Sequence, residues 1–275
     1  MTHPQVSGLF LTGTAGPVFI TRYGPPIASE CLLVIPPFGE EMNKCRRMMF
    51  MIGSEMARRG WVTVLPDLYG TGDSGGDFVD ADWDVWVDDL SRTADWCRSS
   101  GVPVTAVLAV RLGCLLACEQ QFLASIPRVS KSVFWQPVLD GPRYLKQFFR
   151  LRIAASMAND VKESASELLA YLSRDGELEV AGYRLSANLA SQIERVAKPA
   201  ALPDKLGAVD WFEITRLTVG TTAKSTGQED DVGRVATVPA RHVLTGEPFW
   251  ASTEIVLNEE LVKRTCDAFS WRSAE

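Results

Sequence analysis

The stretch 104–117, VTAVLAVRLGCLLA, changes its hydrophobic pattern in the middle. It begins as a valine-rich apolar run, which is typical of a strand buried on both faces. From Leu112 the apolar residues recur at helical spacing, which predicts a helix directly after the strand. Ala109 and Gly113 lie two residues before and two residues after Arg111, and small residues there permit a sharp turn. Such a turn presents its central side chain for nucleophilic chemistry, but here that side chain is the guanidinium of Arg111.

Other side chains that could carry chemistry are few and scattered. The histidines are His3 and His242, and the six cysteines include no CxxC pair, so no metal site is predicted. Cys114 lies three residues beyond the turn and is interpreted as a core thiol, because no histidine is positioned to activate it. The segment that contains Gly70 and Gly72 lacks the full dinucleotide fingerprint. We therefore expect no cofactor.

The elements that must position the turn alternate between strands and helices. The sequence predicts a hairpin over residues 7–23, a buried strand at Cys31–Ile35, a helix from about Lys44 to Arg59, a strand at Trp61–Leu65, a helix capped by Asp82, the strand and helix around Arg111, and a strand at Ser132–Gln136. Asp67 and Ser74, in the glycine-rich segment after the second buried strand, are expected to hold that turn. This alternation predicts βαβ units and a mostly parallel sheet.

After Pro137 the alternation stops. Residues 138–208 show mainly helical patterns, with a short polar strand pattern at Glu177–Tyr183, and are expected to form an insertion over the carboxyl edge of the sheet. Strands are predicted again at Trp211–Leu217 and near Arg241–Leu244, a polar loop at 220–232, and a last helix capped by Asn258. We therefore predict a core at 1–137 and 209–275 and a helical cap at 138–208.

Composition excludes several classes of protein. Apolar residues make up 46% of the 275 and charged residues 23%, which is ordinary for a soluble globular protein. The net charge of −6 disfavours nucleic acid and anionic membrane surfaces as partners. The longest apolar run is interrupted by Arg111 and is too short to span a membrane. With no signal peptide evident and cysteines interpreted as free thiols, we expect a cytoplasmic protein.

Three segments in this order resemble the α/β-hydrolase fold over nearly the whole chain: PPFGEEMNK after the first buried strand, PDLYGTGDSGGDF after the next, and AVRLG at the turn. The resemblance implies a twisted, mostly parallel sheet of about eight strands with helices on both faces and a helical cap insertion. More narrowly, IPPFGEEMNKCRRM, LPDLYGTGDSGGDF, the RLG turn and GEPFWASTEI resemble the second of the hydrolase-like families associated with bacterial exosortase systems. That family implies a role near exopolysaccharide production and the sorting of proteins to the cell envelope.

The resemblance also implies a catalytic triad, which this sequence does not complete. The nucleophile position holds Arg111, which cannot attack a substrate because its guanidinium stays protonated at ordinary pH. The general base would be a histidine after the last strand, and the segment 246–250 contains none. His242, inside or just before that strand, is the remaining candidate for a catalytic base. Loss of both nucleophile and base costs orders of magnitude in rate.

The backbone around the turn is expected to keep its binding geometry. The N–H of Leu112 and that of Phe38 or Gly39 are the candidate oxyanion-hole donors. A helix N-terminus at Leu112 would favour negative charge in the same place. The site would then retain the shape of an active site without its usual chemistry.

Arg111 itself has two interpretations. It is either a buried charge paired with a carboxylate for stability, or the group that binds an anion such as a carboxylate, phosphate or sugar acid. Glu40 and Glu41 are the expected partners, because the loop that carries them faces the turn in this fold. An unpaired guanidinium would cost several kcal/mol to bury, on the order given for buried charges, so a partner is required.

Three functions remain open from the sequence. The first is a degenerate hydrolase that acts as a binding or accessory protein, with Arg111 holding a small anionic ligand. The second is an active esterase or acyl transferase with an unconventional site. The third is a structural subunit that forms a homo- or hetero-oligomer with another hydrolase-fold protein. The missing serine and histidine favour the first and third.

Overall fold

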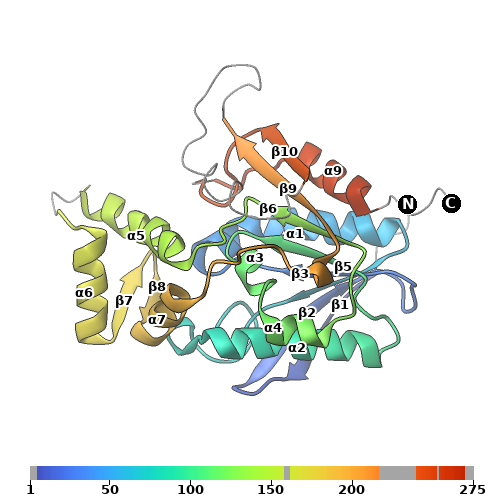
Figure 1. The fold of residues 1–275 in the computed structure, drawn as a ribbon, viewed down its shortest axis with the longest axis horizontal. Helices are drawn as coiled ribbons and strands as arrows, with labels where there is room; N and C mark the ends of the chain where they lie inside the picture. The colour runs from blue at the N-terminus through green and yellow to red at the C-terminus, as the bar shows by residue number, and fades with distance from the viewer. Residues whose placement is uncertain (1–4, 158–161, 217–239, 253, 270–275) are drawn as a thin grey trace.

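A computed structural model describes residues 5–157, 162–216, 240–252 and 254–269, and the predicted loop at 220–232 lies outside them. Its centre is an eight-stranded sheet in the order β1-β2-β4-β3-β5-β6-β9-β10 (Figure 1). The pairs β1–β2 and β2–β4 are antiparallel, and every other pair is parallel. The strands are β1 (Val6–Thr12), β2 (Pro17–Tyr23), β3 (Cys31–Ile35), β4 (Val62–Pro66), β5 (Ala106–Val110), β6 (Lys131–Trp135), β9 (Ala208–Thr215) and β10 (Ala240–Thr245).

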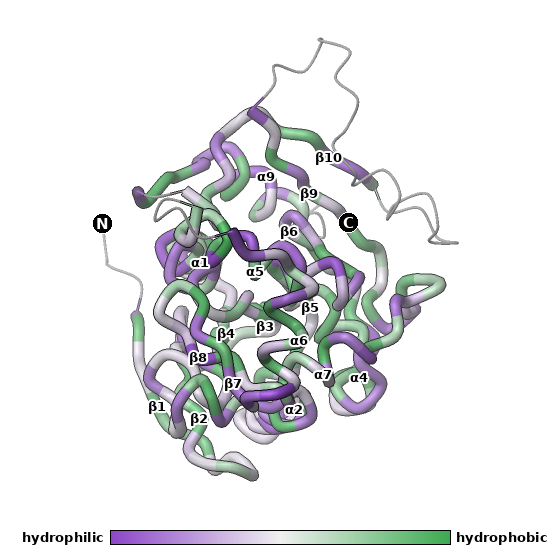
Figure 2. Tube along the Cα trace, turned by 90° about the vertical axis from the view of Figure 1, so that its left-hand side faces the viewer, coloured by the Kyte–Doolittle hydropathy of each residue, from purple (hydrophilic) through white to green (hydrophobic). Residues whose placement is uncertain are grey.

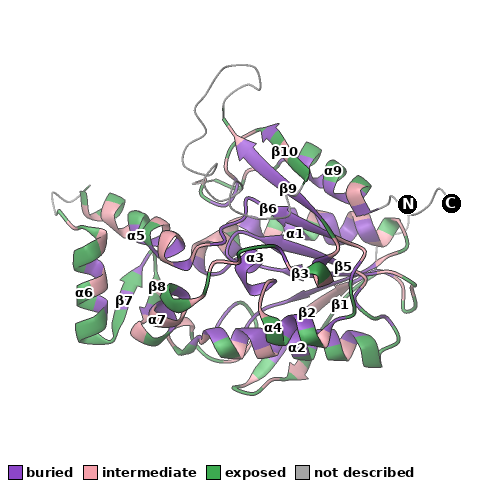
Figure 3. Ribbon diagram, in the orientation of Figure 1, coloured by how far each residue is buried: buried purple, intermediate pink, exposed green. Residues whose placement is uncertain are grey.

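Helices cover both faces of the sheet, as predicted. On one face α1 (Gly39–Arg58) and α9 (Glu259–Phe269) bury methionines and leucines against Trp135 and Phe212. On the other face α2 (Trp83–Ser99) and α4 (Gln120–Ser125) pack against the alternate residues of the same strands. The central strands β3, β4 and β5 are buried at every position, which explains their continuous apolar sequences (Figure 3).

An insertion between β6 and β9 stands at one end of the sheet (Figure 1). It consists of α5 (Gly141–Met157), α6 (Ala165–Asp175), the strands β7 (Glu177–Val180) and β8 (Tyr183–Ser186) and α7 (Ala187–Arg195). The chain then returns to the opposite end of the sheet, where the short helix η2 (Asp204–Leu206) precedes β9. Figure 2 looks onto this insertion. The polar strand pattern is a hairpin here, because Ala181 and Gly182 both have positive φ and turn the chain between two short strands.

Two helix predictions near the turn need correction. Helix α1 begins at Gly39 and not at Lys44, so Glu40 and Glu41 lie in its first turn and not in a loop. Acidic residues at a helix N-terminus are favoured by the helix dipole, which explains the earlier start. The helix after the turn, α3 (Gly113–Leu116), has four residues, and the chain re-forms a helix only at α4. Such a short helix supplies little of the positive end that was expected at Leu112.

Candidate functional site

The turn after β5 has the strained geometry that its sequence predicts. Arg111 has a φ of 55°, in the left-handed region, and its N–H donates to the carbonyl of Trp135 at 2.9 Å. A side-chain carbon at Gly113 would lie 2.7 Å from the carbonyl oxygens of Ile35 and Pro36. The glycine is therefore required, because the turn presses against the end of β3.

The guanidinium of Arg111 is buried and hydrogen-bonded on several sides. Its Nε and Nη2 donate to one carboxylate oxygen of Glu41, at 3.1 and 2.9 Å. Nη2 also donates to Oε1 of Gln147 at 2.8 Å, and Nη1 donates to the backbone carbonyl of Gln136 at 3.1 Å. The predicted ion pair between Arg111 and Glu41 is thus present, with 6% and 14% of the two side chains exposed.

Two segments that are distant in the sequence also contact this ion pair. Tyr144, from α5 of the insertion, donates its hydroxyl to the second carboxylate oxygen of Glu41 at 3.0 Å. Trp250 follows the last strand, and its ring centroid lies 5.2 Å from the guanidinium carbon of Arg111. Trp250 thus stands in the segment where the resemblance places the catalytic histidine, and it contributes a cation–π contact in place of a base.

The charges of the pair stabilise one another. Burial by itself lowers the pKa of Arg111, but the carboxylate of Glu41 and its hydrogen bonds raise that pKa above its ordinary value. Burial raises the pKa of Tyr144 well above its usual range, and the Glu41 carboxylate raises it further. Tyr144 therefore stays protonated and acts as a donor, and Arg111 stays charged.

Glu40 takes no part in this network. It points along α1 and pairs with Lys44 one turn later, at 3.3 Å, on a partly exposed surface. In the first turn of a helix, adjacent side chains differ in direction by about 100°, so only one of the two glutamates can face Arg111. The sequence left both open as partners, and the structure brings Glu41 to the turn.

The candidate oxyanion-hole residues follow the carboxyl ends of two neighbouring strands, β3 and β5. Phe38 is the extended residue before α1, Gly39 follows with a φ of 59°, and Leu112 follows Arg111. The space in front of Phe38 is filled by aromatic rings of the insertion. The ring of Phe38 lies 5.0 Å from that of Tyr144 and 5.6 Å from that of Phe148. The insertion therefore packs directly on this part of the turn.

No activated nucleophile stands beside the turn among the described residues. Burial raises the pKa of the Cys114 thiol well above its usual range, and the same holds for Cys45 beneath Glu41. Both thiols therefore stay protonated. Ser74 holds the glycine-rich turn after β4, as expected. Its hydroxyl donates to the carbonyl of Asp67 at 2.5 Å and accepts the N–H of Phe19 at 2.7 Å.

His242 lies on β10 at some distance from Arg111. The register row that contains it runs through Phe212 and Trp135 to Val110, so three strand spacings, about 14 Å, separate it from the turn. Its ring stacks on Phe212 with the centroids 4.5 Å apart, and its Nε2 is 3.6 Å from Asp210. The structure thus does not bring the candidate base to the nucleophile position.

Several contacts of the site were not predicted from the sequence. Gln147 and Tyr144 lie three residues apart on α5, a spacing that puts both on one helical face, but nothing marked that face as the one above Arg111. Gln136 has a φ of 42° directly after β6, which turns its carbonyl toward the guanidinium. A polar residue at the end of a buried strand was the only available signal.

The described residues contain no group of three or more His, Cys, Asp and Glu side chains that could hold a metal ion. They also include no helix both long and apolar enough to cross a membrane. The sequence matches no protein-family model and no curated protein.

The structure resembles solved α/β hydrolases over nearly their full lengths. Est1E of Butyrivibrio proteoclasticus, solved with ferulic acid bound, aligns with a TM-score of 0.71 at 12% identity, covering 97% of this chain and all of the other. GrgF, an alpha/beta hydrolase from Penicillium, aligns with a TM-score of 0.61 at 16% identity, covering 98% and 100%. XC6422 of Xanthomonas campestris, described as a serine hydrolase without a lid, gives 0.58 at 13%, covering 98% and 97%. The chain has the α/β-hydrolase fold, which confirms the prediction of fold class.

Proposed function

We propose that this chain is a hydrolase-fold protein without hydrolytic chemistry, which acts as a binding or accessory protein. One observation carries the proposal: the nucleophile position holds Arg111, whose guanidinium is buried and bonded to Glu41. A guanidinium cannot attack a carbonyl, and this one is held in a fixed position by an opposite charge. The sequence resemblance to exosortase-associated proteins supports a setting in envelope or exopolysaccharide biogenesis.

The same network defines how an anionic ligand would bind here. In this conformation the donors of Arg111 are directed at Glu41, Gln147 and the carbonyl of Gln136. A ligand carboxylate or phosphate would therefore have to take the place of Glu41 or of Gln147. Displacement of Gln147 would require its side chain, or the insertion that carries it, to move away from Arg111, whereas displacement of Glu41 would break the ion pair.

Ester hydrolysis is the direct test. The wild type should hydrolyse p-nitrophenyl acetate and butyrate no faster than an Arg111→Ala variant, because neither protein has a nucleophile–base pair. A serine-directed fluorophosphonate should label neither. The double variant Arg111→Met with Glu41→Gln serves as the matched control, since it removes both charges and leaves no buried carboxylate unpaired.

An active hydrolase would give a different result in the same experiment. Turnover that falls clearly in both Arg111 variants while circular dichroism stays unchanged would assign Arg111 a catalytic role. Stoichiometric labelling of a single serine would place a nucleophile elsewhere in the chain. Either result would overturn the proposal and favour an esterase or acyl transferase with an unconventional site.

A further inference from the structure

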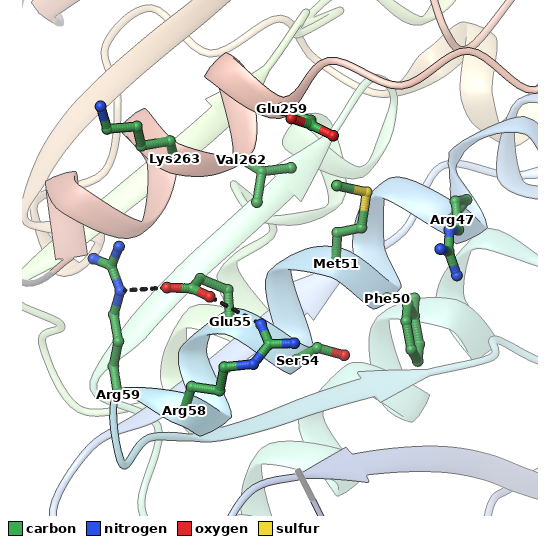
Figure 4. Close-up of a pocket in the computed structure, with 10 residues that line it drawn as sticks. All are labelled: Arg47, Phe50, Met51, Ser54, Glu55, Arg58, Arg59, Glu259, Val262 and Lys263. Carbon is green, nitrogen blue, oxygen red and sulfur yellow. Dashed lines mark hydrogen bonds and ion pairs between the residues drawn. The ribbon is translucent and has the colours of Figure 1, made fainter. Parts of the chain in front are cut away.

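A surface groove runs between the second half of α1 and the first turns of α9 (Figure 4). Its volume is about 350 Å³, and its lining includes Phe50, Met51 and Ser54 from α1 and Val262 and Lys263 from α9. Ser54 lies thirteen residues beyond Glu41 on α1, which is about 20 Å at the rise of an α-helix. The groove is therefore separate from the turn at Arg111.

The floor of the groove is apolar and its walls are open to solvent. Val262 is buried at the base, Met51 is half-buried, and the ring of Phe50 is 40% exposed. An exposed aromatic ring beside a buried valine gives a short apolar strip along two packed helices. An apolar groove of this kind can bind the apolar face of a helix from a partner protein.

The charges of the groove are opposite in sign to those of the whole protein. Four cations and two carboxylates line it, whereas the chain carries a net charge of −6. Figure 4 shows Glu55 between Arg58 and Arg59, and both pair with it, at 2.9 and 3.1 Å. Within the described part of the chain, neither Arg47 nor Lys263 takes part in an ion pair. The guanidinium of Arg47 lies over the Phe50 ring, 5.2 Å from its centroid.

We propose that this groove binds an acidic amphipathic helix of a partner protein. The apolar strip would take the apolar face of the helix, and Arg47 and Lys263 at the rim would pair with acidic side chains on either side of that face. A small molecule fits less well, because small ligands are mostly enclosed, while these walls are exposed. A second copy of this chain also fits less well, since two chains of −6 repel one another.

The proposal involves none of the residues at Arg111. It stands whether or not the chain hydrolyses esters. If the peptide experiment fails, the proposal on hydrolytic chemistry is unaffected, and the reverse also holds. It does supply what an accessory protein needs, which is a surface that selects its partner by charge and by shape.

Fluorescence anisotropy with a designed helix tests the proposal on the full chain. The probe is a labelled peptide of about 18 residues, with a leucine stripe at helical spacing flanked by glutamates. Two further peptides serve as comparisons: a scrambled sequence of the same composition, and one with lysine in place of every glutamate. We expect the wild type to bind the probe at least about tenfold more tightly than either comparison, with an affinity that falls as salt is added.

Charge reversal in the groove should abolish this preference. The pair Arg47→Glu with Lys263→Glu should weaken binding of the probe by about tenfold or more, and the milder pair Arg47→Gln with Lys263→Gln by less. The matched control reverses two exposed arginines of the insertion, Arg150→Glu with Arg195→Glu, and should stay within about threefold of the wild type. Thermal melts verify that each variant is folded.

Three results would overturn the proposal. The first is equal binding of the probe and the scrambled peptide. The second is a loss of affinity in the control pair as large as in the groove pair. The third is a dimer of the wild type in light scattering that the groove reversal dissociates, since the groove would then belong to a second copy of the chain.

Discussion

Two of the buried ionisable groups of this protein meet the cost of burying a charge in opposite ways. Arg111, at the turn after β5, is 5% exposed and bonded to the carboxylate of Glu41. Asp89, on α2, is 1% exposed, and one of its carboxylate oxygens has no partner among the described residues. The guanidinium keeps its charge because it has an opposite charge in contact, whereas burial raises the pKa of Asp89 to about 7.

The two sites also differ in what they connect. The Arg111 network joins the sheet, helix α1 and the insertion through side chains of Glu41, Tyr144 and Gln147. Asp89 holds only a local contact, accepting the backbone N–H of Tyr69 at 2.8 Å in the glycine-rich segment. The buried guanidinium that links distant segments thus has a full set of partners, while the buried carboxyl that holds a single loop is tolerated with a raised pKa. The predictions below test this contrast.

Removing the charge of Glu41 should have the largest effect. Glu41→Gln leaves Arg111 as an unpaired buried cation, and we expect a loss of about 3–5 kcal/mol in the free energy of unfolding. Glu40→Gln is the matched control, because its neighbouring pair with Lys44 is partly exposed and should contribute less than about 1 kcal/mol. Denaturant titration at neutral pH measures both. Equal losses in the two variants would mean that Arg111 is solvated in the native state.

A double-mutant cycle sharpens the same point. Arg111→Met combined with Glu41→Gln should lose less free energy of unfolding than the two single variants added together. Each single variant leaves one charge buried without its partner, whereas the double variant leaves none. The expected coupling is about 1–3 kcal/mol, in the range for residues in one network. Additive losses would contradict a direct ion pair.

Asp89 should show the opposite dependence on charge. Its pKa in the folded state is about 7, above the ordinary value of 3.8. At a pH between these two values, the folded protein therefore keeps a proton on Asp89 that the unfolded chain has lost. Stability from this group is therefore full below pH 4 and falls as the pH rises to 7. Asp89→Asn stays neutral, and its stability relative to the wild type should rise across this range by about 2–4 kcal/mol.

Thermal melts of both proteins between pH 4 and pH 8 measure this difference. Because Asp88 and Arg92 lie near Asp89 and also carry charge, Asp88→Asn serves as the control for general effects of acid removal. A constant difference between Asp89→Asn and the wild type at all pH values would show that Asp89 titrates as an ordinary surface acid.

The contact between Tyr144 and Glu41 should contribute less than the ion pair. Tyr144→Phe keeps the ring against Phe38 and removes the hydroxyl that donates to Glu41. We expect a loss of about 1.5–3 kcal/mol in the free energy of unfolding, the range for a hydrogen bond to a charged group. In the Glu41→Gln background the same change should cost less. An unchanged cost there would show that the hydroxyl does not act through the carboxylate.

His242 should give the smallest effect. It stands three strands from the turn and is 33% exposed, with a stacking contact on Phe212 and Asp210 nearby. His242→Gln should change the free energy of unfolding by about 1 kcal/mol or less, as is usual for partly exposed positions. Ester turnover in the assay above should not change. A specific loss of turnover would restore His242 as a candidate base.

Much of the fold follows from local sequence. The continuous apolar run before Arg111, the glycine two residues after it and the alternation of strands and helices predict the sheet and its turn, because these patterns depend only on period and on local backbone sterics. The structure confirms the hairpin at the start of the chain, the helix capped by Asp82 and the last helix capped by Asn258. The arginine in the place of a nucleophile is also visible in the sequence alone.

Tertiary structure decided which groups meet at that arginine. The sequence offers Glu40 and Glu41 equally, and the choice between them follows from the start of α1 at Gly39, which fixes the direction of each side chain. Tyr144, Gln147 and Trp250 all lie more than thirty residues after Arg111 in the chain, and no local pattern encodes such contacts. A buried charge needs partners on every side, and only the packed chain determines where those partners come from.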